Sequence, residues 1–208
     1  DYVVRFQGGD NAGHTVYVGD EKFVLHLLPS GVLQCKGKCI IANVVVVNPK
    51  SFIKEVNQIE SKNMRTDHIF ISRRAHVIMP YHILLDTYRE EEHGGTQIGT
   101  TKKGIGPCYE DKIARVGIRM IDLLNPEILR DKIEKNLKIK NSLFEKYYGK
   151  PTLDVEEIYN EYLEIGKQLQ DRIVDTELEL NEAIRDGKNV LFEGAQALML
   201  DIDFGTYP

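Results

Sequence analysis

The chain has little of what a disulfide framework, a zinc site or a P-loop needs. Its 208 residues hold three cysteines, an odd number, and the Cys-x3-Cys pair of Cys35 and Cys39 has no second pair of ligands beside it. We therefore expect buried or idle thiols in a reducing cytosol. No Gly-x4-Gly-Lys-Ser/Thr run occurs, which excludes a generic P-loop kinase.

Long apolar runs and an excess of positive charge are also missing. No apolar run approaches the roughly 20 residues of a membrane span, and no signal-peptide pattern opens the chain, so we expect a cytoplasmic protein without a membrane partner. A formal net charge of −5 gives no general affinity for nucleic acid. With 42% hydrophobic and 28% charged residues, the composition is that of an ordinary globular protein.

Apolar segments alternate with amphipathic ones, which predicts an α/β fold with a mostly parallel central sheet flanked by helices. Gly19-Asp20 marks a hairpin, and Asn48-Pro49 is the cap and first residue of a helix whose apolar stripe is Phe52, Ile53, Val56 and Ile59. A second helix is expected from Pro80 to about residue 92. The expected strands are residues 2–6, 16–18, 23–27, 39–47 as one buried central strand, 69–71 and 189–192.

Residues 125–187 differ from the rest and are expected to form a helical insertion of two helices. Asn125-Pro126 opens the first, which closes at Gly149; Asp154 with Glu157 forms a capping box for the second, which stops at Gly187. The apolar stripes predict core packing; they are Leu129, Ile133, Leu137, Phe144 and Tyr147, then Val155, Ile158, Tyr162, Ile165, Leu169 and Ile173. We expect one domain fragment over 1–208: an α/β portion (1–124), a helical subregion (125–187), and a return strand with a nucleotide-binding turn (188–208).

The run at residues 7–15, Gln-Gly-Gly-Asp-Asn-Ala-Gly-His-Thr, is typical of a loop that handles phosphate. Its glycines let the backbone approach an anion closely, and Asn11 can both donate and accept hydrogen bonds. His14 titrates near neutral pH and can donate to a developing oxyanion. A plain connection between a strand and a loop is the simpler alternative for this run alone.

Two further stretches fit the same chemistry. Residues 98–107 hold Thr hydroxyls, two lysines and free amides, with Arg115 beyond them, and such groups bind phosphate oxygens. Residues 192–196 leave an apolar strand for a polar turn, where Gln196 is placed to read a base.

With these blocks the chain resembles bacterial-type adenylosuccinate synthetase. The matching blocks are residues 7–15, 26–31 (His-Leu-Leu-Pro-Ser-Gly), 99–107 with 109–112, and 192–196 with 201–208. Their order along the whole chain is hard to explain by chance. The resemblance implies a homodimeric enzyme of purine biosynthesis that joins IMP to L-aspartate, using GTP and Mg²⁺, through a 6-phosphoryl-IMP intermediate.

The resemblance also implies roles for individual residues. His14 is the catalytic donor facing the transferred phosphoryl group, and Gly13 helps to hold magnesium. Arg115 reaches the IMP phosphate of the neighbouring subunit. The implied IMP-binding residues are Asn11, Ala12, Gly13, His14, Thr101, Arg115 and Gln196, and the implied GTP-binding residues are Gly13, His14 and Thr15.

Each role has a simpler alternative. Thr101 satisfies its own loop backbone, Gln196 caps a turn, and Arg115 pairs with Glu110 or Asp111 at the surface. Two departures from the family pattern bear on these roles. Lys102-Lys103 stands where members commonly have Gly-Arg, and Ala197-Leu198 where they commonly have Gly-Thr.

The family is about twice as long as this chain. Its members carry an upstream Gly-rich loop with a catalytic aspartate and a lysine, and downstream elements that bind aspartate and guanine. We therefore expect an internal fragment that lacks the N-terminal phosphate loop and the C-terminal half, and that has no synthetase activity alone. A nucleotide-binding or assembly module without catalytic activity is the alternative.

Overall fold

The computed structural model describes residues 1–11, 13–34, 36–92, 100–201 and 203–206. Its centre is a sheet of five parallel strands in the order β8-β6-β4-β1-β9. Buried isoleucines, together with Cys39, dominate β4 and β6, because helices or loops cover both faces of such a sheet. The predicted α/β fold with a mostly parallel sheet is confirmed. The strands are β1 (Tyr2–Arg5), β4 (Lys38–Ile41), β6 (Ile69–Ser72), β8 (Ile173–Val174) and β9 (Val190–Glu193).

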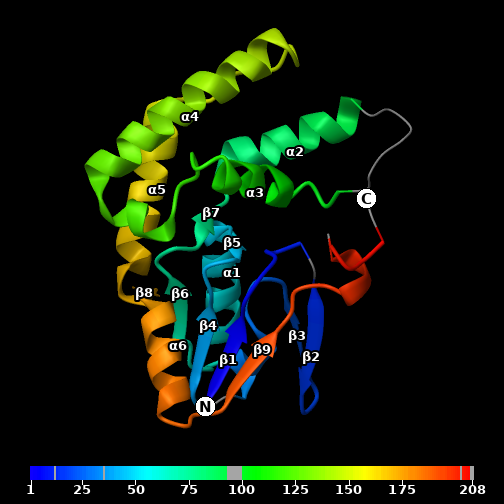
Figure 1. Ribbon diagram of the computed structural model, residues 1–208, viewed down its shortest axis with the longest axis vertical. Helices are drawn as coiled ribbons and strands as arrows, with labels where there is room; N and C mark the ends of the chain where they lie inside the picture. The colour runs from blue at the N-terminus through cyan, green and yellow to red at the C-terminus, as the bar shows by residue number, and fades with distance from the viewer. Residues whose placement is uncertain (12, 35, 93–99, 202, 207–208) are drawn as a thin grey trace.

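Six helices of the described residues are arranged around this sheet. Figure 1 shows α2 and α3 beyond the carboxyl ends of the strands, α4 beside α5, and α6 along the β8 edge. The helices are α1 (Pro49–Glu60), α2 (Pro80–Glu92), α3 (Ile105–Ile113), α4 (Pro126–Lys146), α5 (Val155–Leu169) and α6 (Thr176–Arg185).

The hairpin predicted around Gly19 is confirmed. Strands β2 (His14–Val18) and β3 (Glu21–Leu25) pair antiparallel, and Gly19 turns the chain with a φ of 60°. The register pairs His14 with Leu25, so the first residue of β2 lies beside the end of β3.

The predicted helix after Asn48 is also confirmed. The Asn48 side chain accepts hydrogen bonds from the N–H groups of Lys50 and Ser51, and Pro49 is the first helical residue. Phe52, Val56 and Ile59 are buried as expected, whereas Ile53 is half-buried. The helix expected from Pro80 is α2.

The prediction of one strand over residues 39–47 is wrong. The chain leaves the sheet after β4 and turns, with Val45 N–H bonded to the carbonyl of Ala42. The following β5 (Val46–Val47) belongs to a separate pair with β7 (His76–Val77). The β-branched run stays mostly buried, but its backbone partners change from β1 to the loop at Gly8, to which Val46 N–H donates. Hydrophobic patterning reports burial and cannot report such a change of partner.

The prediction of two helices over residues 125–187 is wrong as well. The caps at Asn125 and Asp154 start α4 and α5 as expected, but α5 ends at Leu169. Ile173 then belongs to β8, which adds to the sheet beside β6. Asp175 caps a third helix, α6, by accepting from Leu178 N–H. The outermost residue of the first stripe, Tyr147, is 63% exposed instead of packed.

A buried polar cluster ties α2, α3 and α4 together. His82 Nδ1 accepts from the N–H of Met79 at 3.0 Å, which leaves the ring to donate through Nε2 to Asp111, also at 3.0 Å. The Lys140 ammonium binds the other oxygen of Asp111 at 2.8 Å. These bonds fix the position of α3 over the ends of the strands, where the candidate site lies.

The cysteines and the helices can also be compared with the expectations from composition. Neither Cys39 nor Cys108 forms a disulfide within the described part of the chain, and both are buried; Cys35 lies outside the described residues. Burial raises the pKa of the Cys108 thiol, so it stays protonated. Over the ranges that the structure covers, we find no helix with the length and apolarity to cross a bilayer.

His76 predicts a measurable pH dependence of stability. Burial, with the nearby Lys112 and Arg119 cations, lowers the pKa of His76 to about 4. An unfolded histidine has a pKa near 6.5, so between these values the unfolded state binds a proton that the folded state does not, and stability falls as the pH falls. Between pH 6.5 and 4.5 the free energy of unfolding of the wild type should fall. In the His76→Asn variant we expect this fall to be smaller by about 1–2 kcal/mol, after allowance for solvent screening.

Urea unfolding of the 208-residue chain at several pH values measures this difference. The comparison removes the contributions of His68 and His82, whose pKa values burial also lowers, because both proteins retain them. Equal slopes for the two proteins would show that His76 is not kept neutral by the fold.

Candidate functional site

Three segments that are far apart in the sequence meet beyond the carboxyl ends of β1 and β9 (Figure 1). A Cβ atom on Gly8 would lie 2.3 Å from the Cβ of Ala195, and one on Gly9 would lie 2.5 Å from Cδ1 of Ile105. Only residues without side chains allow this approach. The structure thus joins the stretch at 7–15 to the start of α3 and to the turn after β9.

Tyr109 of α3 holds the glycine loop in place. The N–H of Gly8 donates to the Tyr109 hydroxyl at 3.0 Å, and the hydroxyl donates to the carbonyl of Val44 at 2.8 Å. Gly8 has a φ of 82°, in the left-handed region that glycine adopts without strain. Burial raises the pKa of Tyr109, so its hydroxyl remains a donor.

Three buried polar atoms within residues 10–14 have no hydrogen-bond partner among the described residues. They are Asp10 Oδ1, Asn11 Oδ1 and His14 Nε2. Folded proteins pair more than about nine in ten buried polar groups, so this concentration makes the loop a candidate ligand site. Gly13 and Thr15 are exposed beside it, and Ala12 lies outside the described residues.

His14 begins β2 and is half-buried. Burial lowers the pKa of His14, helped by the positive charge of Arg5, whereas Glu193 acts in the opposite direction. The ring is therefore neutral at pH 7 and can offer an N–H or a lone pair to a ligand at Nε2. This geometry is compatible with the donor role expected of His14.

Residues 100–104 lead into α3 along a strained path. Lys102 has a φ of 54° and Gly104 a φ of 75°. For a lysine this left-handed backbone costs roughly 1–2 kcal/mol. The N–H of Gly104 donates to the buried carboxylate of Asp86 at 2.9 Å, which holds the segment against α2. Thr101 is exposed.

Lys103 links this segment to the glycine loop. Its ammonium lies 3.7 Å from Oδ2 of Asp10, a side chain that is 1% exposed. The same carboxylate oxygen accepts from the hydroxyl of Ser51 at 2.6 Å. The Asp10 side chain is therefore buried between α1 and the segment before α3.

Gln196 lies in the turn that follows β9. It is exposed, and its Oε1 is 3.8 Å from the position that a Cβ of Gly8 would take. The structure thus places Gln196 beside the glycine loop. The neighbouring Ala195 is buried against Gly8 and fixes the turn.

Arg115 is not brought together with the other candidates. It follows α3 at the end opposite to Gly104, about 16 Å along the helix. Arg115 is exposed, with a φ of 63°. The surface ion pair suggested as its simpler role is not formed, because Glu110 pairs with Arg89, and Asp111 pairs with Lys140 and His82.

The described residues contain no cluster of three or more His, Cys, Asp or Glu side chains that could hold a metal ion. Magnesium, however, often keeps several waters and takes only one or two protein oxygens beside substrate phosphates. The exposed backbone of Gly13 fits such a partial role.

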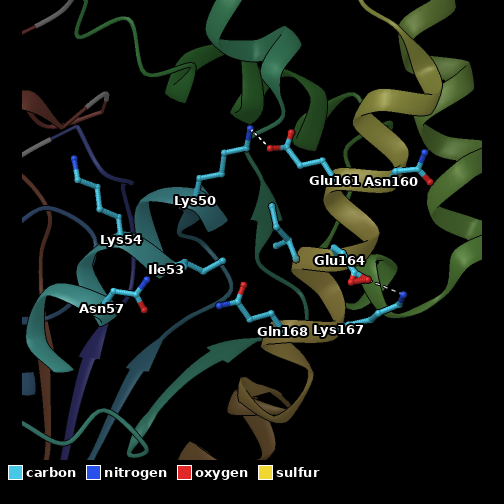
Figure 2. A pocket seen from close by; sticks show the side chains of 10 residues that line it. Lys50, Ile53, Lys54, Asn57, Asn160, Glu161, Glu164, Lys167 and Gln168 are labelled. Carbon is cyan, nitrogen blue, oxygen red and sulfur yellow. Dashed lines mark hydrogen bonds and ion pairs between the residues drawn. The ribbon is translucent and has the colours of Figure 1, made fainter. Parts of the chain in front are cut away.

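A separate groove lies between α1 and α5, with a volume of about 920 Å³. Figure 2 shows that its walls carry long polar side chains, among them the Lys50–Glu161 ion pair at 2.6 Å. None of the candidate nucleotide-binding residues lines it. The groove is open, and eight of its ten lining residues are polar or charged; we assign no chemistry to it.

The comparisons with known proteins agree with the geometry. A sequence model described as adenylosuccinate synthetase matches residues 1–208. The chain belongs to the adenylosuccinate synthetase family. It is 58% identical to the adenylosuccinate synthetase of Fusobacterium nucleatum and 54% identical to that of Heliobacterium modesticaldum, covering all of this chain and 49% of each relative.

Among solved structures, the chain is similar to a fully ligated adenylosuccinate synthetase from Plasmodium falciparum. The TM-score is 0.89 at 40% identity, over 100% of this chain and 48% of that one. The chain thus spans about half the length of the relatives it matches.

The strained Lys102 is one place where this chain departs from the adenylosuccinate synthetase pattern. Its left-handed φ is one that glycine adopts without strain, in agreement with the glycine that the resemblance leads one to expect there. At the second departure, Ala197 is exposed and the chain enters a short 3-10 turn, Leu198–Leu200, directly after Gln196.

Sequence reasoning missed the residues that support the site. Asp10 is an unremarkable position in the family run, and Asp86 lies in a helix far along the chain, so no pattern pointed to either. Arg5 and Glu193 carried a usable signal, because a charged residue within an apolar strand needs a buried partner. They form that pair, with Arg5 Nη1 3.2 Å from Glu193 Oε1.

Tyr109→Phe tests the support of the glycine loop. The substitution leaves the N–H of Gly8 and the carbonyl of Val44 without their partner, so the free energy of unfolding is expected to fall by about 1–3 kcal/mol. Urea unfolding of the 208-residue chain measures it. Tyr17→Phe, at a side chain that is 63% exposed, is the matched control and is expected to change stability little. Equal stabilities for both variants would contradict the role given to Tyr109.

Proposed function

We propose that this sequence is part of an enzyme that joins IMP and L-aspartate at the expense of GTP and forms adenylosuccinate through 6-phosphoryl-IMP. The observation that carries the proposal is the unpartnered Nε2 of a neutral His14 in a glycine loop that touches both α3 and the turn before Gln196. Membership of the adenylosuccinate synthetase family supports the ligase class.

The chemistry requires a better leaving group on the purine. The 6-oxygen leaves poorly, and phosphorylation by GTP makes it displaceable by the amino group of aspartate. A phosphoryl group in transfer carries charge on its oxygens, and a fixed donor stabilises that charge. His14 donates through Nε2 to this group and acts as the catalytic residue, since its neutral ring and lack of another partner leave that atom available.

IMP is proposed to lie across the three joined segments. Thr101 binds its 5′-phosphate through the exposed hydroxyl, and Gln196 contacts the base. Asn11, Gly13 and His14 are proposed to contact the reacting end of the purine, together with Ala12, which lies outside the described residues. The support for this placement is the proximity of the loops around Gly8.

GTP and magnesium are proposed to meet the same loop at Gly13, His14 and Thr15. Gly13 would hold magnesium through its backbone oxygen, and the metal would neutralise charge on the phosphates. The base that removes the purine N1 proton and the guanine-reading element belong to other parts of the longer enzyme. The 208 residues alone are therefore expected to have no synthetase activity.

The enzyme is further proposed to be a cytoplasmic homodimer. Arg115 lies away from the loops of its own chain, and it is flanked by the exposed apolar side chains of Ile113 and Val116, which are 78% and 45% exposed. A two-fold contact at this face would bring each Arg115 to the IMP phosphate of the partner.

Subunit mixing tests the site and the dimer together. In the complete protein, His14→Ala is expected to lower turnover by roughly 10²-fold or more with little change in IMP affinity, because the donor acts mainly in the transition state. Arg115→Leu is expected to be similarly inactive. When the two variants exchange subunits in equal amounts, about a quarter of all sites should recover, since mixed dimers hold one intact site.

The measurement is phosphate release that depends on both IMP and aspartate. Two copies of the same variant, mixed in the same way, are the control and should recover nothing. Confirmed exchange without recovered activity would place Arg115 outside the partner's site. A complete wild-type protein without synthetase activity would favour the binding or assembly module instead.

A further inference from the structure

The segment at residues 26–31 follows β3 and has no role in the proposal so far. Its first residue, His26, lies directly against the glycine loop. A Cβ atom on Gly13 would be 3.0 Å from Nε2 and 3.1 Å from Cδ2 of the His26 ring. The ring therefore packs on the backbone at the residue before His14.

A buried carboxylate holds the backbone of this segment. Glu55 of α1 is 5% exposed and accepts from the N–H of His26 at 2.9 Å, of Leu27 at 3.1 Å and of Leu28 at 3.0 Å. Three successive N–H groups around one carboxylate leave little freedom to the chain. The Nδ1 atom of His26 lies 3.6 Å from the same carboxylate, on the side of the ring away from Gly13.

Charged side chains also hold the carbonyl of His26 and the N–H of Ser30 in this segment. Arg5, which is 1% exposed, donates through Nη2 to the carbonyl of His26 at 3.1 Å. Its Nη1 binds Glu193, whose carboxylate accepts from the N–H of Ser30 at 2.9 Å. Both ends of the segment are thus fixed to charged groups beneath the loop.

The side chain of His26 itself differs from the groups that hold it. It is 41% exposed and so contributes little to the core. A half-exposed ring on a rigidly held backbone, in contact with a glycine beside the proposed catalytic histidine, has the geometry of a support for that glycine.

We propose that His26 is a positioning residue, whose ring sets the backbone at Gly13 and thereby the place of His14, and that Arg5, Glu55 and Glu193 hold His26 for this purpose. The inference rests on the proposed function for its activity readout. His26 would thus affect turnover by positioning Gly13, and it would not contact a substrate itself.

A double-mutant cycle between Gly13 and His26 tests the contact. The backbone of Gly13 is outside the left-handed region, so Gly13→Ala is opposed mainly by the ring of His26. We expect each of Gly13→Ala and His26→Ala to lower the turnover of the complete protein by about 10-fold or more, because a small misplacement of a catalytic group is costly. The double variant should be no worse than the poorer single one, since the ring that clashes is gone.

His26→Phe distinguishes ring packing from charge. A ring of similar size keeps the contact with Gly13, so turnover is expected to stay within about 3-fold of the wild type, whereas KM for IMP should change little in either His26 variant. Gly19→Ala is a control for the cycle, although its left-handed φ of 60° makes this substitution strained in itself. Gly19 is in the turn of the same hairpin, has no described atom within 4 Å of a Cβ, and should combine additively with His26→Ala.

A readout without substrate separates this inference from the proposed function. In the complete protein without nucleotide, the ¹H–¹⁵N heteronuclear NOE of the Gly13 and His14 amides should fall in His26→Ala and be retained in His26→Phe. Unchanged NOE values in His26→Ala, or additive losses in the cycle, would overturn the role of His26. A complete wild-type protein without synthetase activity would overturn the proposed function and leave the NOE result to decide the inference.

Discussion

Close contact at Gly8 and Gly9 is the constraint on which the candidate site depends. The parallel strands β1 and β9 end side by side, and the chain after β1 must pass between the turn after β9 and the first turn of α3. A side chain at Gly8 would overlap Ala195, and one at Gly9 would displace the end of the Ile105 side chain and crowd the carbonyl of Val46. Because the glycines carry none, residues separated by nearly the whole chain form one surface, as is common at the carboxyl ends of parallel strands.

Buried charges then fix the parts of this surface that the glycines bring together. Arg5, Glu55 and Glu193 hold the segment after β3, whereas Asp111, between His82 and Lys140, holds α3. Such groups are costly to bury and depend on their partners, although Nε of Arg5 has none among the described residues. A few polar atoms of the glycine loop are left without a partner instead, and these include the ring nitrogen of His14.

The sequence predicted the fold class, the hairpin and the capped helices. These features depend on hydrophobic periodicity, helix-capping residues and turn residues, which act on their neighbours in the sequence. Asn48, Asn125 and Asp154 cap helices as expected. The split of residues 39–47 into β4 and β5 and the return of Ile173 to the sheet depend on distant backbone partners, which no local pattern encodes. The same limit holds for the site. The blocks around His14, Thr101 and Gln196 could be recognised, but the supporting roles of Asp86, Tyr109 and Glu55 arise only when the chain is folded.

The central claim is that these joined loops form one nucleotide site around His14. A crystal structure of the complete protein with IMP and GTP tests it most directly. The account predicts the IMP phosphate within hydrogen-bonding distance of Thr101, the purine beside Gln196, and Nε2 of His14 facing the transferred phosphoryl group. Nucleotides bound elsewhere, for example in the groove between α1 and α5, with Nε2 of His14 still unpartnered, would contradict it.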